Sequence, residues 1–521
     1  MGRYALPDGY LGSCIESIGS IWFIILGNVI EWFELSSFGF LAPQLDENLF
    51  HGNSAAMWAA FAVSFIARPL GATCFGWISD KVGRRLSVVL SLAGLVVGTV
   101  GQGMLPTYTC CGDGGGHTGV VLLIILRIVL GFCVGGEIAG VSVYLAEYKD
   151  QSVLGTMSAS ISVGASLGFA LSTALISALL HTLTEEEMML WGWRIPFLIT
   201  IVPGAISLVL RWTHIKETHE VLRAGFISGH NSDVDLDEDG SLNDDLSHCS
   251  GDGSAGSVNS DDRLIEQEMT KKEVKKLMGS DVLASLQYLP EDIERDRKHR
   301  IHEDDSLYGH LFPLFALLRH YPVRFMLGFF GVAACAMGWY IGSIYVVSYV
   351  QKFQKVSNQD AMLMGLINSS MSVVFTPIGG FLADAIGVGK THVLSTLLLF
   401  LICIPFWAVL VLVEDNRTVY FIAFAVYGAI QGICCAVPFL YVAELFPKSL
   451  RASGFLSYNL GIAIFGGLSP LLCEVLALRI TYGPMVYQAG ISLVALGFVG
   501  AAHYAHAAGA WKLPNIRMNP F

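Results

Sequence analysis

The sequence predicts an all-α membrane protein with twelve transmembrane helices in two bundles of six. Hydrophobic residues make up 53% of the 521 residues and charged residues only 14%, and the mean hydropathy is +0.57. This composition is too apolar for a soluble globular chain. Apolar stretches of about 20 residues, long enough to cross a bilayer core of about 30 Å, recur along the chain. One long polar segment divides them into two sets.

The apolar stretches give the predicted helices in order. The first set covers residues 18–41, 55–77, 87–104, 120–144, 157–180 and 193–212. The second set covers residues 323–348, 361–383, 392–413, 418–442, 453–476 and 485–508. We therefore expect an N-terminal six-helix bundle over residues 1–212, a loop over 213–311 and a C-terminal six-helix bundle over 312–521.

The loop between the bundles has two parts of different character. Residues 231–262 consist largely of Asp, Ser, Gly and Asn, with no Lys or Arg. Such a stretch buries too little apolar surface to offset its chain entropy, so we expect it to be disordered. In residues 264–293 apolar side chains recur at helical spacing after a Thr270–Glu273 capping pattern, which predicts amphipathic helices under the membrane domain or, alternatively, a regulatory helix.

The distribution of Lys and Arg in the loops predicts the orientation. The basic residues on one side are Lys81, Arg84, Arg85, Lys149, Lys390, Lys448, Arg451, Lys512 and Arg517. The other side holds mainly Lys352, Lys355, Arg417 and Arg479. The richer side should be cytoplasmic, so both termini and the long loop are expected there. We expect the plasma membrane, with an endomembrane as the alternative.

Charged residues inside the apolar stretches are concentrated in the first half of the chain. Glu31 and Glu34 lie in the middle of the first stretch, where each carboxylate costs about 2.5 to 3.5 kcal/mol in lipid. Arg68 reaches a similar depth on the second helix, and Arg127 and Glu137 lie on the fourth. These five residues must face one another or a polar cavity.

These buried charges have two possible interpretations, one functional and one structural. Neighbouring carboxylates repel, so one of them should hold a proton near neutral pH, as a proton carrier requires. We therefore assign Glu31, Glu34 and Glu137 to proton coupling, and Asn28, Arg68 and Arg127 to substrate binding. A purely structural network of ion pairs is the alternative, and for Arg68 it is equally consistent with the sequence.

No motif for a cofactor, a metal or a chemical reaction is recognisable. The chain has no Walker loop, catalytic triad or metal-ligand cluster, which excludes an enzyme and disfavours an ATP-driven pump. Cysteines such as Cys335 are scattered singly in apolar helices and read as core residues, with Cys110 and Cys111 the one adjacent pair of interest. The net charge of −12 owes much to the loop, so no nucleic-acid partner is expected.

Motifs at helix ends predict a gate. Residues 76–85, Gly-Trp-Ile-Ser-Asp-Lys-Val-Gly-Arg-Arg, join the second and third helices, and Asp80 can pair with Arg84 and Arg85 across the helix ends. With Arg127–Gly135 on the fourth helix, this pattern closely resembles the signature motifs of the major facilitator superfamily. The resemblance implies two six-helix bundles around a central cavity.

Further motifs narrow the resemblance to the metabolite:proton symporter family, which carries proline, betaine, 2-oxoglutarate, shikimate and citrate. The matching runs are Gly27–Glu34, Ala67–Gly71, Gly135–Glu137, Ala146–Tyr148, Trp191–Phe197, Ala443–Pro447 with Arg451, and Tyr458–Pro470. The family implies proton-driven transport of a small carboxylated or zwitterionic metabolite. The gating residues expected from the motifs are Asp80, Arg84, Arg85, Glu147, Arg194, Asp384, Glu444 and Arg451.

Several positions depart from the family pattern. Glu34 stands where the family usually has Asp, and Leu130 where a Gln commonly precedes the Gly. The second gating motif, Gly380–Lys390, lacks paired arginines. Glu34 keeps the carboxylate, so the proton chemistry is unaffected, whereas Leu130 and the long acidic loop point to a substrate that differs from those of the compact bacterial members.

The sequence thus predicts proton-coupled symport of a small metabolite by alternating access, in a monomeric unit within the lipid bilayer. In the second half, the residues expected to complete the cavity are Trp339, Tyr345, Gln431, Tyr458 and Asn459. The alternatives are a facilitative sugar or polyol uniporter, a proton-coupled cation or drug exporter, and, more remotely, a nutrient sensor that does not transport.

Overall fold

The computed structural model describes residues 10–81, 84–146, 153–214, 318, 321–413, 416–446 and 451–508. In these residues all regular secondary structure is helical. The helices of the N-terminal half are α1 (Tyr10–Phe40), α2 (Ala42–Phe50), α3 (Ser54–Lys81), α4 (Arg84–Gly103), α5 (Tyr108–Ala146), α6 (Leu154–Thr182), α7 (Glu185–Leu190), η2 (Gly192–Arg194), α8 (Ile195–Ile199) and α9 (Ile201–His214).

The C-terminal half is also helical, with several helices interrupted in mid-membrane. Its elements are α15 (Pro322–Gly331), α16 (Ala333–Trp339), η3 (Tyr340–Tyr345), α17 (Val346–Phe353), α18 (Asn358–Ile386), α19 (Val388–Leu412), α20 (Arg417–Cys434), α21 (Pro438–Leu445), α22 (Arg451–Gly461), η5 (Ile462–Gly467), α23 (Ser469–Ala477) and α24 (Gly483–Ala507). The segments η3 and η5 are π-helical, a form that is frequent at functional sites.

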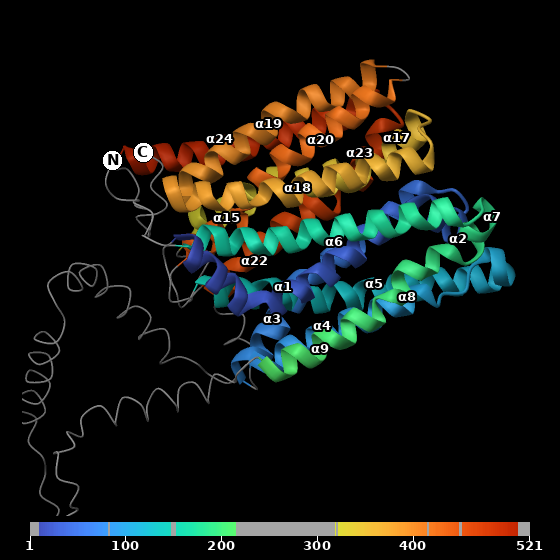
Figure 1. Ribbon diagram of the computed structural model, residues 1–521, viewed down its shortest axis with the longest axis horizontal. Helices are drawn as coiled ribbons and strands as arrows, with labels where there is room; N and C mark the ends of the chain where they lie inside the picture. Colours follow the sequence, from blue (N-terminus) through green and yellow to red (C-terminus); the bar gives the residue numbers. More distant parts are fainter. Residues whose placement is uncertain are drawn as a thin grey trace, which may run out of the picture. The chain divides into compact units, whose positions relative to one another are not determined.

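The prediction of many apolar helices is confirmed in the described residues, and their number is eleven or twelve. Eleven helical segments are long and apolar enough to cross a membrane, and there are twelve if the two parts of α1, bent by 70°, form one span. Helices lying side by side, such as α6 and α18, are visible in Figure 1. The predicted acidic linker and amphipathic helices at residues 231–293 lie outside the described residues.

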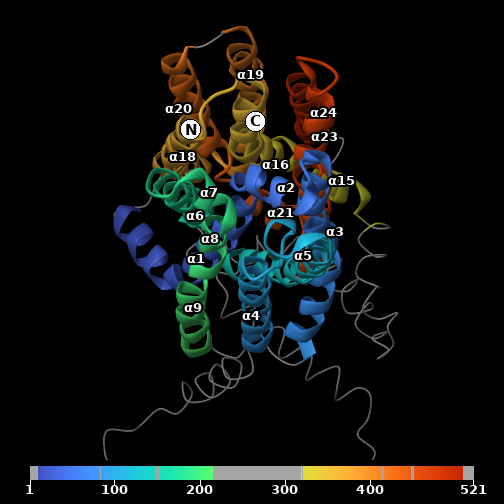
Figure 2. The same ribbon diagram turned by 90° about the vertical axis from the view of Figure 1, so that its right-hand side faces the viewer.

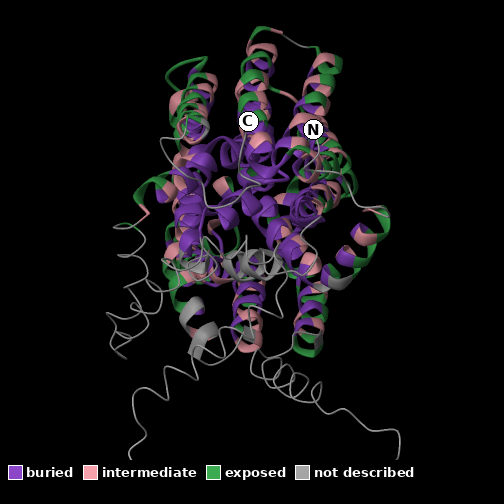
Figure 3. Cartoon of the chain, turned by 90° about the vertical axis from the view of Figure 1, so that its left-hand side faces the viewer, coloured by how far each residue is buried: buried purple, intermediate pink, exposed green. Residues whose placement is uncertain are grey.

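The membrane-facing and interior surfaces are clearly divided. Buried residues concentrate in the middle of the helix assembly, and exposed residues lie on its outer faces (Figure 3). Many of these exposed side chains are large and apolar, among them Ile66, Val97, Val202, Leu401 and Val486. A water-exposed surface does not carry so much apolar area, so these faces are suited to contact with lipid.

Glycines bring α3 and α5 into backbone contact. A Cβ at Gly131 would stand 1.8 Å from the carbonyl oxygen of Ser64, and one at Gly135 would stand 2.0 Å from that of Arg68. Neither site admits a methyl group without moving a helix. Small residues at such crossings are how membrane helices pack closely, and this crossing holds Arg68 and Arg127 at neighbouring depths.

The two halves of the chain meet along α6 and α18, and serines of α6 form the polar contacts. Ser158 and Ser162 donate hydrogen bonds to the carbonyls of Ala436 and Cys435, at 3.2 and 2.8 Å. These carbonyls lie in the break between α20 and α21. Seen end-on, α19, α20 and α24 stand on the opposite side of the assembly from α4 and α9 (Figure 2).

A single methyl group at the α3–α5 crossing should be destabilising. Gly131→Ala is expected to lower the thermal midpoint of the detergent-solubilised protein, because overpacking costs about 1 to 3 kcal/mol. Gly497→Ala on α24 is the matched control, since nothing lies within 4 Å of its added Cβ. An equal loss of stability in both variants would mean that the crossing is not tightly packed.

Candidate functional site

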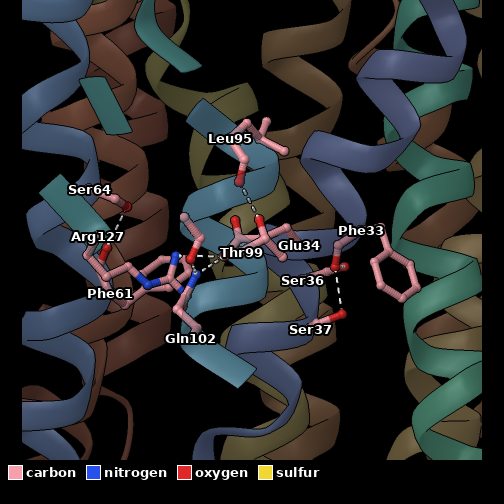
Figure 4. Close-up of polar contacts among 11 residues, drawn as sticks. Phe33, Glu34, Ser36, Ser37, Phe61, Ser64, Leu95, Thr99, Gln102 and Arg127 are labelled. Carbon is pink, nitrogen blue, oxygen red and sulfur yellow. Dashed lines mark hydrogen bonds and ion pairs between the residues drawn. The ribbon is translucent and has the colours of Figure 1, made fainter. Parts of the chain in front are cut away.

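The first buried polar cluster joins three helices of the N-terminal half. Arg127 Nη1 on α5 lies 3.2 Å from Glu34 Oε1 on α1, and neither side chain is more than 1% exposed. Gln102 on α4 donates to the same Glu34 oxygen at 3.1 Å, and the Arg127 guanidinium lies 3.5 Å from the centre of the Phe38 ring. Figure 4 shows this arrangement around Glu34.

Glu31 and Arg68 are the charged residues of a second buried cluster, close to the interface between the halves. Both are almost completely buried, at 2% and 1% exposure. Their charges act on the hydroxyl groups of Tyr340 and Tyr458, which come from the C-terminal half, and the Arg68 guanidinium lies 4.3 Å from the centre of the Phe65 ring. Glu31 and Arg68 are therefore charged residues of the N-terminal half that interact with side chains of the C-terminal half.

A small cavity lies beside this second cluster. Its lining comes from both halves: Trp32, Ser162, Ala165, Val332, Cys335, Ala336, Trp339, Tyr340, Cys435, Pro438, Phe439, Tyr458 and Ile462. In this conformation it has room for little more than a water molecule. Aromatic rings form much of its wall, with Trp32 and Trp339 5.7 Å apart and Phe439 and Tyr458 5.3 Å apart between ring centres.

The other predicted binding residues are buried but do not line this cavity. Asn28 holds α1 to α6 by donating to the Ile161 carbonyl at 2.6 Å, and it accepts a hydrogen bond from Trp32 Nε1. Gln431 exchanges hydrogen bonds with Ser343 within the second half. The Asn459 amide is buried and makes no hydrogen bond within the described part of the chain.

One end of the interface between the halves is closed by Asp384 at the end of α18. Its carboxylate accepts hydrogen bonds from the Gly155 and Thr156 amides at 2.7 and 2.9 Å, and from the Thr156 and Tyr10 hydroxyls. A carboxylate at a helix N-terminus accepts hydrogen bonds from the free amides of the first turn. Its negative charge also interacts favourably with the helix dipole. The positive-inside pattern predicts that this end is cytoplasmic.

The remaining predicted gating residues are only partly described. The side chains of Asp80, Arg84, Glu137, Glu147 and Arg451 lie outside the described residues. Arg85 packs over the Trp212 ring at 4.2 Å, and Glu444 is buried. Arg194 donates to the Gly103 and Leu105 carbonyls at 3.0 and 2.6 Å, so it fastens the end of α4 within its own half.

The opposite end of the interface between the halves is closed by residues that the sequence did not predict to form a gate. Glu474 on α23 is buried and contacts Lys352 of α17. Ser54 at the start of α3 donates to Glu474 at 2.7 Å, and Tyr345 donates to its other oxygen at 3.1 Å. Ser54 belongs to the first half and the others to the second. A carboxylate within the predicted apolar stretch 453–476 was the signal available in the sequence.

A buried arginine on α9 was also missed. Arg211 is 1% exposed, and its guanidinium lies against Gly27 of α1, where an added Cβ would stand 1.7 Å from Nη2. The glycine at position 27 therefore admits the guanidinium between the two helices. Arg211 is the second-last residue of the predicted stretch 193–212, where a charge is usually assigned to the membrane surface.

Comparisons with known proteins identify the family and the fold of the chain. The major facilitator superfamily model matches residues 24–470, and the fold resembles that of a D-xylose-proton symporter, with a TM-score of 0.63 at 14% identity over 96% of this chain and 98% of that one. Together with the apolar helices, this defines an integral multi-pass membrane protein. The chain belongs to the major facilitator superfamily.

Curated relatives match the metabolite:proton symporters that the motifs resemble. The chain is 35% identical to a proline/betaine transporter of Salmonella typhimurium over 211 residues, 40% of either chain. The first such relatives are thus matched over less than half of their length. A citrate-proton symporter of Klebsiella pneumoniae is 25% identical over 88% of this chain and 85% of its own length.

Asp384 should hold the first turn of α6 in place. In Asp384→Asn, amide exchange at Gly155 and Thr156 is expected to become roughly tenfold faster or more, because a hydrogen bond to a charged group contributes about 1.5 to 3 kcal/mol. Hydrogen–deuterium exchange with mass spectrometry measures this. Asp360→Asn is the control, since Asp360 at the other end of α18 pairs with Arg417 of the same half. Unchanged amide exchange in Asp384→Asn would contradict the role of Asp384 in closing this end of the interface between the halves.

Asp46 should make stability depend on pH. It lies on α2, outside the membrane spans, and burial raises the pKa of its carboxyl to about 6, opposed by Lys352. The folded protein therefore binds this proton more tightly than the unfolded chain, so its charging costs stability as the pH rises toward and through 6. Asp46→Asn should unfold at a higher temperature than the parent at about pH 7.5, and this gap should shrink at about pH 5. A gap that does not change with pH would contradict this.

Proposed function

We propose that the protein is a proton-coupled symporter that carries a small carboxylated or zwitterionic metabolite across the plasma membrane by alternating access, as a monomeric unit. The observation that carries the proposal is the burial of Glu31 and Arg68, whose charges act on two tyrosines, Tyr340 and Tyr458, that line a cavity between the halves. The closed contacts at both ends of the interface, at Asp384 and at Glu474, support an occluded intermediate of such a cycle.

The charges favour a substrate with one carboxylate. Glu31, Glu34, Arg68 and Arg127 together carry no net charge, and Arg127 is already paired with Glu34. A proton taken up by Glu31 leaves one uncompensated positive charge next to the cavity. That charge matches a single substrate carboxylate held by Arg68, whereas a tricarboxylate would bring two further charges into a site of low dielectric constant.

The cavity wall favours an ammonium group at the other end of the substrate. Aromatic faces attract a cation, by about 0.5 to 2 kcal/mol, and Trp32, Trp339 and Tyr458 line the cavity. A zwitterion with its carboxylate at Arg68 and its ammonium group among these rings uses both features. The proline/betaine transporters among the relatives carry solutes of this kind by name.

Proton coupling is energetically sufficient. A proton entering down a potential of about 100 mV releases about 2.3 kcal/mol, and a difference of about one pH unit adds about 1.4 kcal/mol. This concentrates a neutral solute several-hundredfold. With Glu31 protonated, the substrate carboxylate compensates the charge of Arg68. The one charge left over in the occluded site is then the ammonium group of the substrate, which the aromatic faces of the cavity stabilise.

The proposal is tested by uptake into proteoliposomes under an imposed pH gradient. The radiolabelled panel is proline, glycine betaine, 2-oxoglutarate, citrate, shikimate, glucose and a polyamine. Accumulation of proline or betaine that a protonophore abolishes is the expected result. Glucose uptake that only equilibrates would instead identify a uniporter, and polyamine extrusion against proton entry would identify an exporter.

Removing the Glu31 carboxylate should uncouple transport. Glu31→Gln is expected to abolish accumulation against a gradient and to leave exchange of labelled for unlabelled substrate, because no proton needs to bind. Glu16→Gln, at an exposed position of the same helix, is the control and should accumulate substrate normally. Full accumulation by Glu31→Gln and also by Glu34→Gln would remove both carboxylates from the coupling mechanism.

Replacing the Arg68 guanidinium by an ammonium group should weaken substrate binding. Arg68→Lys keeps the positive charge and loses the two-pronged hydrogen bonding to a carboxylate, so the apparent affinity for the substrate should fall about tenfold. Arg479→Lys, at an exposed position, is the control. An unchanged affinity in a folded Arg68→Lys protein would assign Arg68 to structure.

A further inference from the structure

Two cysteines from distant parts of the chain meet at the cavity. Cys335 on α16 and Cys435, directly after α20, are 100 residues apart in sequence, yet their sulfur atoms lie 2.8 Å apart. Both side chains are buried, at 6% and 1% exposure, and both line the cavity. Both are free thiols in the structure. In the sequence, Cys335 reads as an ordinary apolar core residue.

The thiol pair joins the parts of the second half that face the substrate. Cys435 lies in the break between α20 and α21, and its carbonyl accepts the 2.8 Å hydrogen bond from Ser162 of the first half. Cys335 lies one turn before Trp339, at the start of the cavity wall that continues into the π-helical η3. A covalent bond between the sulfurs would therefore fix the helix break to this wall.

We propose that Cys335 and Cys435 form a redox-sensitive site, in which hydrogen peroxide oxidises the two thiols to a disulfide that reversibly arrests transport. One sulfur attacks a peroxide oxygen and becomes a sulfenic acid, with release of one water. The second thiol then displaces the hydroxyl group of the sulfenic acid, which forms the S–S bond and releases a second water. The thiols lose two electrons and two protons in total, and the peroxide is reduced to water.

The size and polarity of the cavity select the oxidant. A space that admits little more than a water molecule admits hydrogen peroxide, which is small and uncharged, and excludes a bulky charged disulfide such as oxidised glutathione. The attacking species is a thiolate, and a buried apolar wall disfavours that charge. Oxidation in this closed conformation is therefore expected to be slow.

The chemistry is tested without reference to any substrate. The full chain in proteoliposomes is treated with hydrogen peroxide, alkylated with N-ethylmaleimide and digested without reductant. Mass spectrometry should find a linked pair of peptides that contains Cys335 and Cys435, and dithiothreitol should abolish it. Treatment with oxidised glutathione should give no linked pair. Recovery of both cysteines only as alkylated or over-oxidised residues would overturn the proposal.

The effect on transport rests on the proposed function and is measured separately. Oxidation should raise the thermal midpoint and suppress uptake of the panel compound that the parent accumulates, both reversibly with dithiothreitol. Cys335→Ser and Cys435→Ser should each lose these responses. Cys403→Ser, a buried cysteine on α19 away from the cavity lining, should keep them.

The possible failures are distinguishable. A linked peptide and a raised midpoint in a protein that transports none of the panel compounds would contradict the proposed function and leave the thiol chemistry in place. Inhibition of equal size in Cys335→Ser, Cys435→Ser and the parent would overturn the assignment of the thiol pair as the site of inhibition. A linked peptide together with unchanged uptake would contradict the proposal that the disulfide arrests transport.

Discussion

The cost of burying charge in a membrane governs this structure. Glu34 and Arg127 are both out of contact with water, and each would be strongly destabilising alone, because removing one partner of a buried ion pair costs about 3 to 5 kcal/mol. Pairing them requires α1 and α5 to lie at a fixed distance and depth. The close α3–α5 crossing at Gly131 and Gly135 fixes the position of α5, and with it that of Arg127, against α3.

The same constraint distinguishes the roles of the two carboxylates. Glu34 has a permanent partner within its own half, whereas Glu31 lies where the charges of the first half reach Tyr340 and Tyr458 of the second. A group whose surroundings change as the halves separate is suited to bind and release a proton. A group paired within one rigid half is suited to hold that half together. Glu31 is therefore the better candidate for coupling, and Glu34 for organising the site.

The fold was largely predictable from the sequence, and the partners of the charged residues were not. Hydropathy alone placed most helices to within a few residues, since every spanning backbone must satisfy its own hydrogen bonds in lipid. The exceptions are α1 and α5, which begin at Tyr10 and Tyr108, well before the predicted starts at residues 18 and 120. The spacing of Glu31 and Glu34 placed both on one helix face. The pairing of Glu34 with Arg127, the position of Arg211 against Gly27, and the closure at Glu474 depend on helix-to-helix geometry that no single-helix pattern contains. The same is true of the meeting of Cys335 and Cys435.

The most direct test of the central claim is whether substrate movement by itself drives protons. Proteoliposomes containing a pH-sensitive dye are prepared without a pH gradient and with the membrane potential clamped at zero, and an inward gradient of the transported zwitterion is applied. The account predicts acidification of the interior by the parent and none by Glu31→Gln. Entry of substrate by the parent without acidification would contradict proton symport.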